Sequence, residues 1–312
     1  MAPNQRKPSD IETVEQSPQQ QIRRDKLNSK SEMTDNANHE VKDSKKEDTS
    51  IPGFIRKRKI SFEKTYGKMT LREFEGADCT GATLICGFPS GVSLTSVLVT
   101  NYISDQLKLP VIGDIVSEHI QPRCYVENDK ASNACRILGD NRIVLILSEY
   151  QMNERLMNNM ISAILDFSQR WKIASIVTIE GLPIQGSTEK EADSKNLRFL
   201  STNEEFCKIL HEQLGHKGIN EALITGFTAG IISEVCAGKA NDVTALLAPV
   251  SPRHPDAVSA VPVVKALEQL IPNIKIDTKP LEEKAKELEK GISKAISEIE
   301  GQSKRNMQFM YG

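Results

Sequence analysis

Apolar and polar residues alternate along residues 66–279 in the way that is typical of an α/β protein. Short runs of apolar, often β-branched residues recur between amphipathic stretches of helical length, with breaks at Gly and Pro. Strands are expected over residues 82–88, 111–117, 123–127, 134–138, 143–147, 173–180, 222–226 and 243–250. Helices are expected over residues 92–107, 153–171, 203–214, 229–237 and 256–270. This order predicts a three-layer α/β sandwich, in which helices cover both faces of a mostly parallel or mixed sheet. The strands between residues 111 and 147 are expected to form an antiparallel excursion.

The N-terminal segment, residues 1–65, lacks this pattern. Its first 50 residues contain no aromatic side chain and are dense in Gln, Ser, Asn and charged residues of both signs. Such a segment buries too little apolar surface to offset the entropy that folding costs. We therefore expect a disordered head over residues 1–65, followed by an α/β domain over residues 66–279.

The segment 280–300 carries a narrow apolar stripe between charged positions. The stripe consists of residues at alternating spacings of four and three, namely Leu281, Ala285, Leu288, Ile292, Ala295 and Ile299. This spacing predicts a heptad helix whose coiled-coil seam binds a second helix. The alternative is that the stripe packs on the chain's own α/β domain, because it contains fewer than three full heptads. The pattern ends at Gly301, and residues 301–312 are expected to be a flexible tail.

Charge and hydropathy narrow the choice of partners. The chain has 40 Lys and Arg against 42 Asp and Glu, and the formal net charge of −2 gives no general attraction for nucleic acid or an anionic membrane. No stretch approaches the roughly 18 apolar residues of a membrane-spanning helix, and the first thirty residues lack the apolar core of a signal peptide. We expect a cytoplasmic protein with no nucleic acid and no membrane as partner. The basic run Arg56–Lys59 keeps a nucleic-acid adaptor open as a minor alternative.

Candidate groups for metal or phosphate chemistry are few. Cys207, His211 and His216 fall on one predicted helix, but the CxxC pairs of structural zinc sites are absent from the sequence. The turn Gly87–Ser93 joins a strand to a helix, where α/β proteins bind phosphate, yet it has neither a phosphate-binding glycine motif nor a lysine. We therefore expect no metal, no cofactor and no catalytic residue.

Three residues mark a candidate ligand crevice. Gly87, Glu180 and Gly226 each lie at the end of a predicted strand. Ligands of open α/β sheets enter at strand ends, so these residues would line a ligand crevice.

A set of short motifs recurs in a fixed order along residues 70–300. The set is Gly87-Phe88-Pro89, Leu109–Gly113, Ser117-Glu118, Glu180–Pro183, Leu223–Gly226, Leu246–Pro249, Pro255–Ala257 and Leu270–Pro272. In order and spacing it resembles the archaeal proteasome-assembly-chaperone family, also called the PAC-two family. The resemblance implies a fold similar to that of nucleoside phosphorylases, in a protein that is a chaperone or ATP-independent proteasome activator and no enzyme. It also implies a homo-oligomer, a tetramer or a pentamer.

The last three residues match a docking motif. Met310-Tyr311-Gly312 is a hydrophobic-tyrosine-any triplet, which resembles the ending by which proteasome activators and chaperones insert between α-ring subunits. The carboxylate of Gly312 can pair with a lysine, Tyr311 offers a ring and a hydroxyl, and Met310 can fill an apolar groove. We therefore expect the tail to bind the α-ring of the proteasome core particle. The alternative function is a small-ligand-binding protein or enzyme that uses the crevice for a nucleoside or a phosphorylated metabolite, the ligand classes that the similarity of fold to nucleoside phosphorylases implies. Assembly, activation and substrate delivery are not distinguished by the sequence.

Overall fold

The computed structural model describes residues 57–90, 93–127, 130–183, 196–238, 241–250, 256–288 and 290. Predictions for residues 1–56 and 301–312, including the docking residues Met310, Tyr311 and Gly312, lie outside these ranges. Ile292, Ala295 and Ile299 of the predicted seam lie outside them as well.

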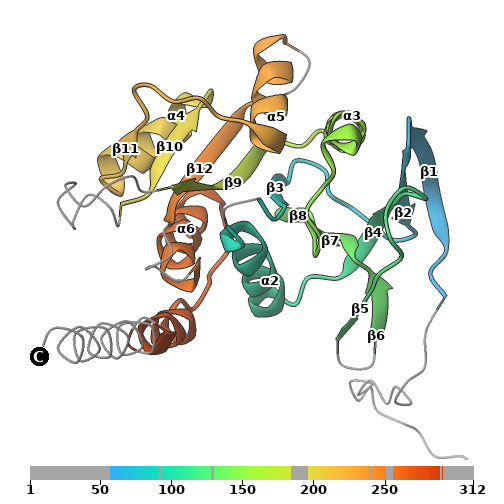
Figure 1. Cartoon of the computed structure of the whole chain (residues 1–312), viewed down its shortest axis with the longest axis horizontal. Coiled ribbons are helices and arrows are strands. Elements are labelled where there is room, and N and C mark those ends of the chain that lie inside the picture. The colour runs from blue at the N-terminus through green and yellow to red at the C-terminus, as the bar shows by residue number, and fades with distance from the viewer. Residues whose placement is uncertain are drawn as a thin grey trace, which may run out of the picture. The chain divides into compact units, whose positions relative to one another are not determined.

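A ten-stranded sheet forms the centre of the described chain, in the order β1-β2-β4-β7-β8-β3-β9-β12-β10-β11 (Figure 1). The neighbours β8, β3, β9 and β12 run parallel to one another. The steps from β1 through β2, β4 and β7 to β8 are antiparallel, and so is the pairing of β10 with β12. The strands are β1 (Ile60–Tyr66), β2 (Met69–Phe74), β3 (Thr83–Gly87), β4 (Val111–Val116), β7 (Cys135–Gly139), β8 (Ile143–Ser148), β9 (Ser175–Pro183), β10 (Arg198–Ser201), β11 (Lys217–Gly218) and β12 (Val243–Val250).

The predicted mixed sheet is confirmed, and β4, β7 and β8 form the predicted antiparallel excursion, but the predicted strand over residues 123–127 lies outside the large sheet. Between β4 and β7 the chain also forms a separate hairpin of β5 (Cys124–Glu127) and β6 (Lys130–Asn133). The shortest strand of the large sheet, β11, pairs with β10 in parallel.

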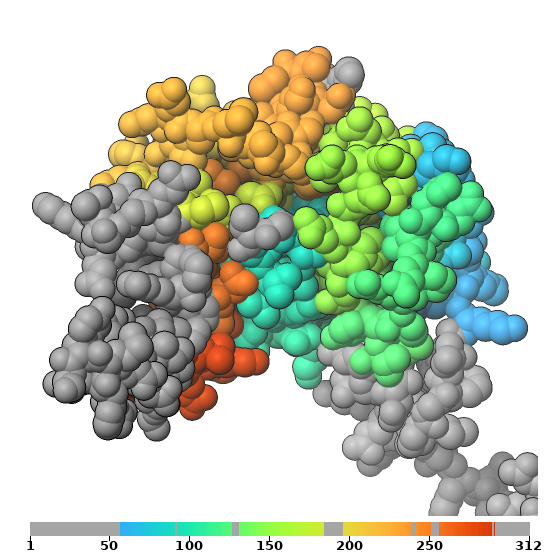
Figure 2. All heavy atoms as spheres, viewed as in Figure 1, coloured from blue at the N-terminus to red at the C-terminus, as the bar shows by residue number. Residues whose placement is uncertain are grey.

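Helices cover both faces of the sheet, as the sequence predicts. On one face α3 (Glu154–Arg170) and α5 (Gly226–Cys236) pack over Leu84 and Cys86 of β3. On the other face α2 (Thr95–Leu107) and α6 (Asp256–Leu270) pack over Ile85, the residue between them. Successive side chains of a strand point to opposite faces, so one apolar strand supplies both cores. Figure 2 shows the yellow-green atoms of α3 lying against the orange atoms of α5. A further helical segment, α4 (Glu204–Lys208) followed by the π-helix η1 (Ile209–Gln213), buries Leu210 in the second core.

One predicted strand is absent, the start of the sheet was misplaced, and β2, β6, β10 and β11 were not predicted. Residues 222–225 form no strand, and α5 begins directly after them, at Gly226. Leu223 in this segment is 92% exposed, so its apolar run belongs to a surface loop. The sheet also begins at Ile60, ahead of the predicted domain start at residue 66. Most side chains of β1 are exposed, so this strand gives little apolar signal in the sequence.

The predicted heptad helix begins as expected, since residues 279–288 are helical. Its first two seam residues, Leu281 and Ala285, are buried, and Leu281 joins the core beneath α2 and α6. Lys265 Nζ on α6 also pairs with Glu282 Oε1 at 2.7 Å. Leu288 by contrast is 43% exposed. The start of the stripe therefore packs on the chain's own domain, and self-association through the seam stays a prediction.

None of the helices in the described ranges is long and apolar enough to cross a lipid bilayer.

A charged network attaches the edge hairpin β1–β2 to α3. Asp166 of α3 accepts hydrogen bonds from Lys64 Nζ at 2.6 Å, from the Tyr66 hydroxyl at 2.5 Å and from Arg170 Nε at 2.6 Å. Arg170 also donates to Glu73 Oε1 of β2 at 2.5 Å. Partial burial opposes ionisation of Asp166, but these hydrogen bonds outweigh it and lower the pKa of Asp166 to about 2.

Asp166→Asn should lower the free energy of unfolding by about 1–2 kcal/mol at pH 7. A carboxyl whose pKa is lower in the folded state stabilises the fold above its unfolded pKa, and this contribution disappears as the pH falls toward the folded pKa. The difference in unfolding free energy between Asp166→Asn and the wild type should therefore shrink below about pH 4. Urea unfolding over a pH series measures this difference. The control is Glu75→Gln, which removes the exposed ion pair between Lys59 Nζ and Glu75 Oε2 at 3.6 Å. It should change the free energy of unfolding very little. A loss of unfolding free energy as large as that of Asp166→Asn would contradict a specific role for the network.

Candidate functional site

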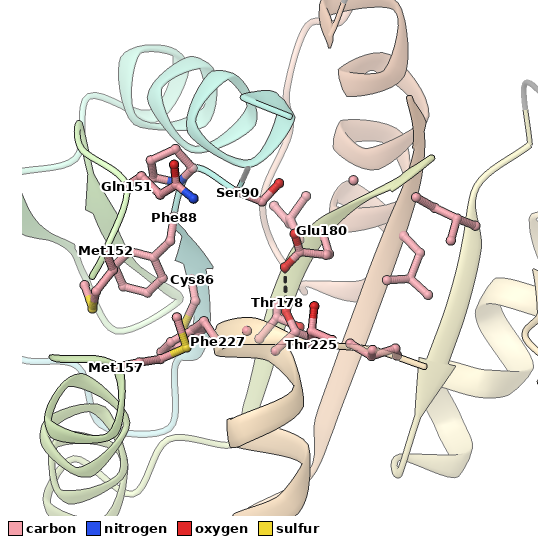
Figure 3. A pocket seen from close by; sticks show the side chains of 18 of the residues that line it. Cys86, Phe88, Ser90, Gln151, Met152, Met157, Thr178, Glu180, Thr225 and Phe227 are labelled. Carbon is pink, nitrogen blue, oxygen red and sulfur yellow. Dashed lines mark hydrogen bonds between the residues drawn. The ribbon is translucent and has the colours of Figure 1, made fainter. Parts of the chain in front are cut away.

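A pocket of about 620 Å³ lies where β3 and β9 end and α5 begins (Figure 3). Parallel strands end at the same edge of a sheet, and the loops that follow them leave a hollow there. The loop Phe88–Ser90 after β3, the end of β9, the segment 151–157 around the start of α3 and the first turn of α5 form its walls.

One side of the pocket is apolar. Figure 3 shows the rings of Phe88 and Phe227 together with the sulfur atoms of Cys86, Met152 and Met157. The two rings meet edge to face with their centroids 4.6 Å apart, an arrangement that aromatic pairs prefer. Burial raises the pKa of the Cys86 thiol well above its usual range, so Cys86 contributes to the wall as an apolar thiol and not as a nucleophile.

The opposite side is polar, with oxygen atoms of Ser90, Thr178, Glu180 and Thr225 (Figure 3). Glu180 Oε2 accepts a hydrogen bond from Thr228 Oγ1 at 3.3 Å. Burial is the largest influence on Glu180 and raises the pKa of its carboxyl, although the hydrogen bonds it accepts favour the charged form. The pocket therefore holds a carboxyl group that is poorly solvated.

The turn before α2 is closed to anions. Asp256, at the start of α6, accepts hydrogen bonds from Ser93 Oγ at 2.9 Å, Leu94 N at 3.0 Å and Thr95 Oγ1 at 3.2 Å. A carboxylate thus occupies the helix N-terminus at which α/β proteins bind phosphate. A second anion would meet its repulsion.

Two of the three predicted crevice residues lie in the pocket. Glu180 and Gly226 are among its lining residues, whereas Gly87 is not. Gly87 follows Cys86 and so faces α2, where a Cβ atom would come within 2.4 Å of Thr100 Oγ1. Its lack of a side chain permits close packing of α2 on β3 and does not serve the pocket. Gly226 has φ of 77° at the start of α5, a conformation that favours glycine.

Thr178 was not predicted as a site residue, although the two-residue period of a strand could have indicated it. Thr178 precedes Glu180 by two residues on β9 and therefore shares its face. The aromatic and sulfur-containing wall had no such signal, because separate segments meet there only in the folded chain.

No group of three His, Cys, Asp or Glu side chains in the described ranges is placed to hold a metal ion. The Cys207 thiol donates a hydrogen bond to the carbonyl oxygen of Ser201 at 3.8 Å. Burial lowers the pKa of the His216 imidazole.

Glu180→Gln should raise the melting temperature at pH 7. A carboxyl whose pKa is raised by folding destabilises the folded state when it is ionised, and this cost disappears as the pH falls below its unfolded pKa of about 4.3. The gain should therefore shrink toward pH 4, as measured by thermal unfolding over a pH series. Glu154 lies in the first turn of α3, where a carboxylate stabilises the helix N-terminus. Glu154→Gln should therefore lower the melting temperature at pH 7. A lower melting temperature for Glu180→Gln at pH 7 would show that its carboxylate is well solvated.

Solved structures share this fold. The chain is similar to Pyrococcus furiosus PbaA, an archaeal homologue of proteasome-assembly chaperone, with 21% identity and a TM-score of 0.63 over 78% of this chain and 98% of that one. It is also similar to Pyrococcus furiosus PbaB, an archaeal proteasome activator, with 18% identity and a TM-score of 0.60 over 73% and 98% of the two chains. A Thermoplasma acidophilum protein shows 22% identity and a TM-score of 0.55 over 76% and 93%.

A comparison with curated proteins found no match. The model of the PAC2 family matches residues 84–296, more than half of the chain. The matched stretch includes the central strands, all the pocket-lining segments and the start of the heptad helix. The resemblance predicted from the ordered motifs is thereby confirmed, and the chain belongs to the PAC2 family.

Proposed function

We propose that this protein is a proteasome assembly chaperone or ATP-independent activator, which binds the α-ring of the proteasome core particle through its C-terminal tail. Membership of the PAC2 family carries the proposal. The descriptions of PbaA as a homologue of proteasome-assembly chaperone and of PbaB as a proteasome activator support it. The cytoplasmic location expected from the sequence is part of the proposal.

The helix over residues 279–288 supports a role for the tail. Leu281 and Ala285 bury one side of this helix, and the Lys265–Glu282 pair links it to α6. Tyr102 on α2 donates to the Asp277 carbonyl just before the helix, at 2.5 Å. The described chain therefore ends at a helix that is attached firmly to the domain. We propose that this attachment limits the volume that a flexible tail with Met310, Tyr311 and Gly312 can reach.

Multivalency is the second part of the proposal. A tripeptide buries too little surface to bind tightly by itself. Several tails on one homo-oligomer, a tetramer or pentamer, raise the effective concentration of each later contact, provided that their spacing matches the α-ring. Leu288 is exposed at the end of the described part of the seam, and we propose that it contacts another copy.

We also infer that the protein is not an enzyme. The pocket-lining residues in the described ranges include neither Lys, Arg nor His, and the Cys86 thiol is held in its neutral form by burial. Glu180 and Glu154 are the carboxyl groups among them, and no cationic side chain accompanies either in this lining.

Removal of Met310–Gly312 should abolish binding to the purified core particle, because the motif supplies the carboxylate, the ring and the apolar side chain together. Native gels measure binding, and peptide-hydrolysis assays measure activation. Light scattering serves as the control, because the truncated protein should form the same oligomer as the full-length protein. Tyr311→Phe should bind better than Tyr311→Ala, since it keeps the ring. Faster hydrolysis on binding indicates an activator, and binding without it a chaperone. Equal binding by the truncated form would refute tail docking.

Leu288→Glu should lower the oligomer mass without lowering the melting temperature, because Leu288 is exposed within one copy. Leu281→Ala is the matched control, and it should cost about 2–4 kcal/mol of unfolding free energy through loss of buried volume. Sedimentation velocity and urea unfolding measure the two effects. An unchanged mass for Leu288→Glu would exclude the seam as the oligomer contact while leaving tail docking open.

A further inference from the structure

The pocket contains a buried hydroxyl group without a partner. Among the described residues, two buried side-chain polar atoms make no hydrogen bond, Arg136 Nη1 and Thr178 Oγ1. Thr178 is 1% exposed and lines the pocket. Buried hydroxyl groups are normally paired, because an unpaired one loses its bonds to water without replacement. A ligand that fills the pocket could supply the missing bond.

The first turn of α5 adds donors to the same site. Gly226, Phe227 and Thr228 line the pocket, and the N-cap residue Thr225 makes no side-chain hydrogen bond to the helix. The first backbone N–H groups of a helix have no partner within it. Together with Thr178 and Glu180, they place hydrogen-bond donors and acceptors at one end of the pocket.

Charge argues against an anionic ligand. The described lining contains no cationic side chain, and its carboxyl groups belong to Glu154 and Glu180. The neighbouring N-terminus of α2 is already occupied by Asp256. A phosphorylated metabolite is therefore disfavoured as the ligand.

Volume and polarity indicate a small ligand with two unlike parts. The volume of about 620 Å³ is within the range of small-molecule sites. Rings and sulfur atoms form one side, and oxygen atoms form the other (Figure 3). The rings of Phe88 and Phe227 suit an aromatic body, while the polar side suits an edge that both donates and accepts.

We propose that this pocket binds an uncharged planar heterocycle with adjacent hydrogen-bond donors and acceptors, the class that includes free nucleobases and nucleosides. Thr178 and Glu180 bind the polar edge, and Phe88, Phe227 and Met152 pack against the ring. None of the described lining residues belongs to residues 301–312, so this inference does not depend on proteasome docking.

Calorimetric titration and thermal unfolding of the full chain with adenosine, inosine and uridine test the proposal. At least one nucleoside should bind and raise the melting temperature, because a ligand that binds only the folded state stabilises it. Its 5′-monophosphate should bind at least about tenfold more weakly, since it adds charge to a site without cations. No shift with any nucleoside, or tighter binding of the monophosphates, would overturn the proposal.

Thr178→Val keeps the shape of the side chain and removes the hydroxyl. It should weaken nucleoside binding roughly tenfold, while the free protein keeps or raises its melting temperature. Thr178→Ser should retain binding. Thr244→Val is the matched control: Thr244 is equally buried on β12, but its hydroxyl bonds to Ser201 Oγ at 2.7 Å. It should therefore lower stability and leave nucleoside affinity unchanged.

Two results would overturn the role of Thr178. Unchanged nucleoside affinity in Thr178→Val would show that the hydroxyl takes no part in binding. A loss of stability in the ligand-free Thr178→Val protein equal to that in Thr244→Val would show that the hydroxyl already has a partner.

Discussion

The central strands of the sheet have to be covered on both faces, because all residues of β3, β8 and β12 are buried. Such strands carry apolar side chains on both faces, so one layer of helices would leave one apolar face exposed to water. The pairs α3–α5 and α2–α6 meet this need from opposite sides. The crossovers that make β8, β3, β9 and β12 parallel also bring the ends of β3 and β9 to one edge. The pocket is therefore a consequence of how the core is built.

The strength of the apolar signal decided how much of the fold could be predicted. β3, β8 and β12 are continuous apolar runs, and α3 and α6 have clear helical lengths and ends, so each was located within a few residues. β1 was missed because its pairing with β2 depends on backbone hydrogen bonds while most of its side chains face solvent. The segment 222–225 was misassigned for the converse reason, since it is an apolar run that is not in the core.

The candidate site was predictable only in part, and the period of the strand explains where prediction failed. Glu180 was found because it is a charged residue directly after a buried apolar run, although β9 continues past it to Pro183. Gly87 was misplaced by one position along β3, since an odd step turns a residue to the other face. The unpaired state of Thr178 depends on the absence of neighbours in three dimensions. The joining of Phe88 to Phe227 depends on tertiary packing. Neither leaves a pattern in the sequence.

The strand order has a consequence for synthesis of the chain. β12 pairs along the whole length of β9, from Val243 beside Ile176 to Val250 beside Pro183, so a ribosome must add on the order of 70 residues after β9 before this pairing can form. At about 5–20 residues per second, the apolar edge of β9 waits unpaired for several seconds. Such an edge is a template for pairing with other chains. Nascent copies on one messenger are thus exposed to mispairing in this interval, and slower translation between β9 and β12 would lengthen it.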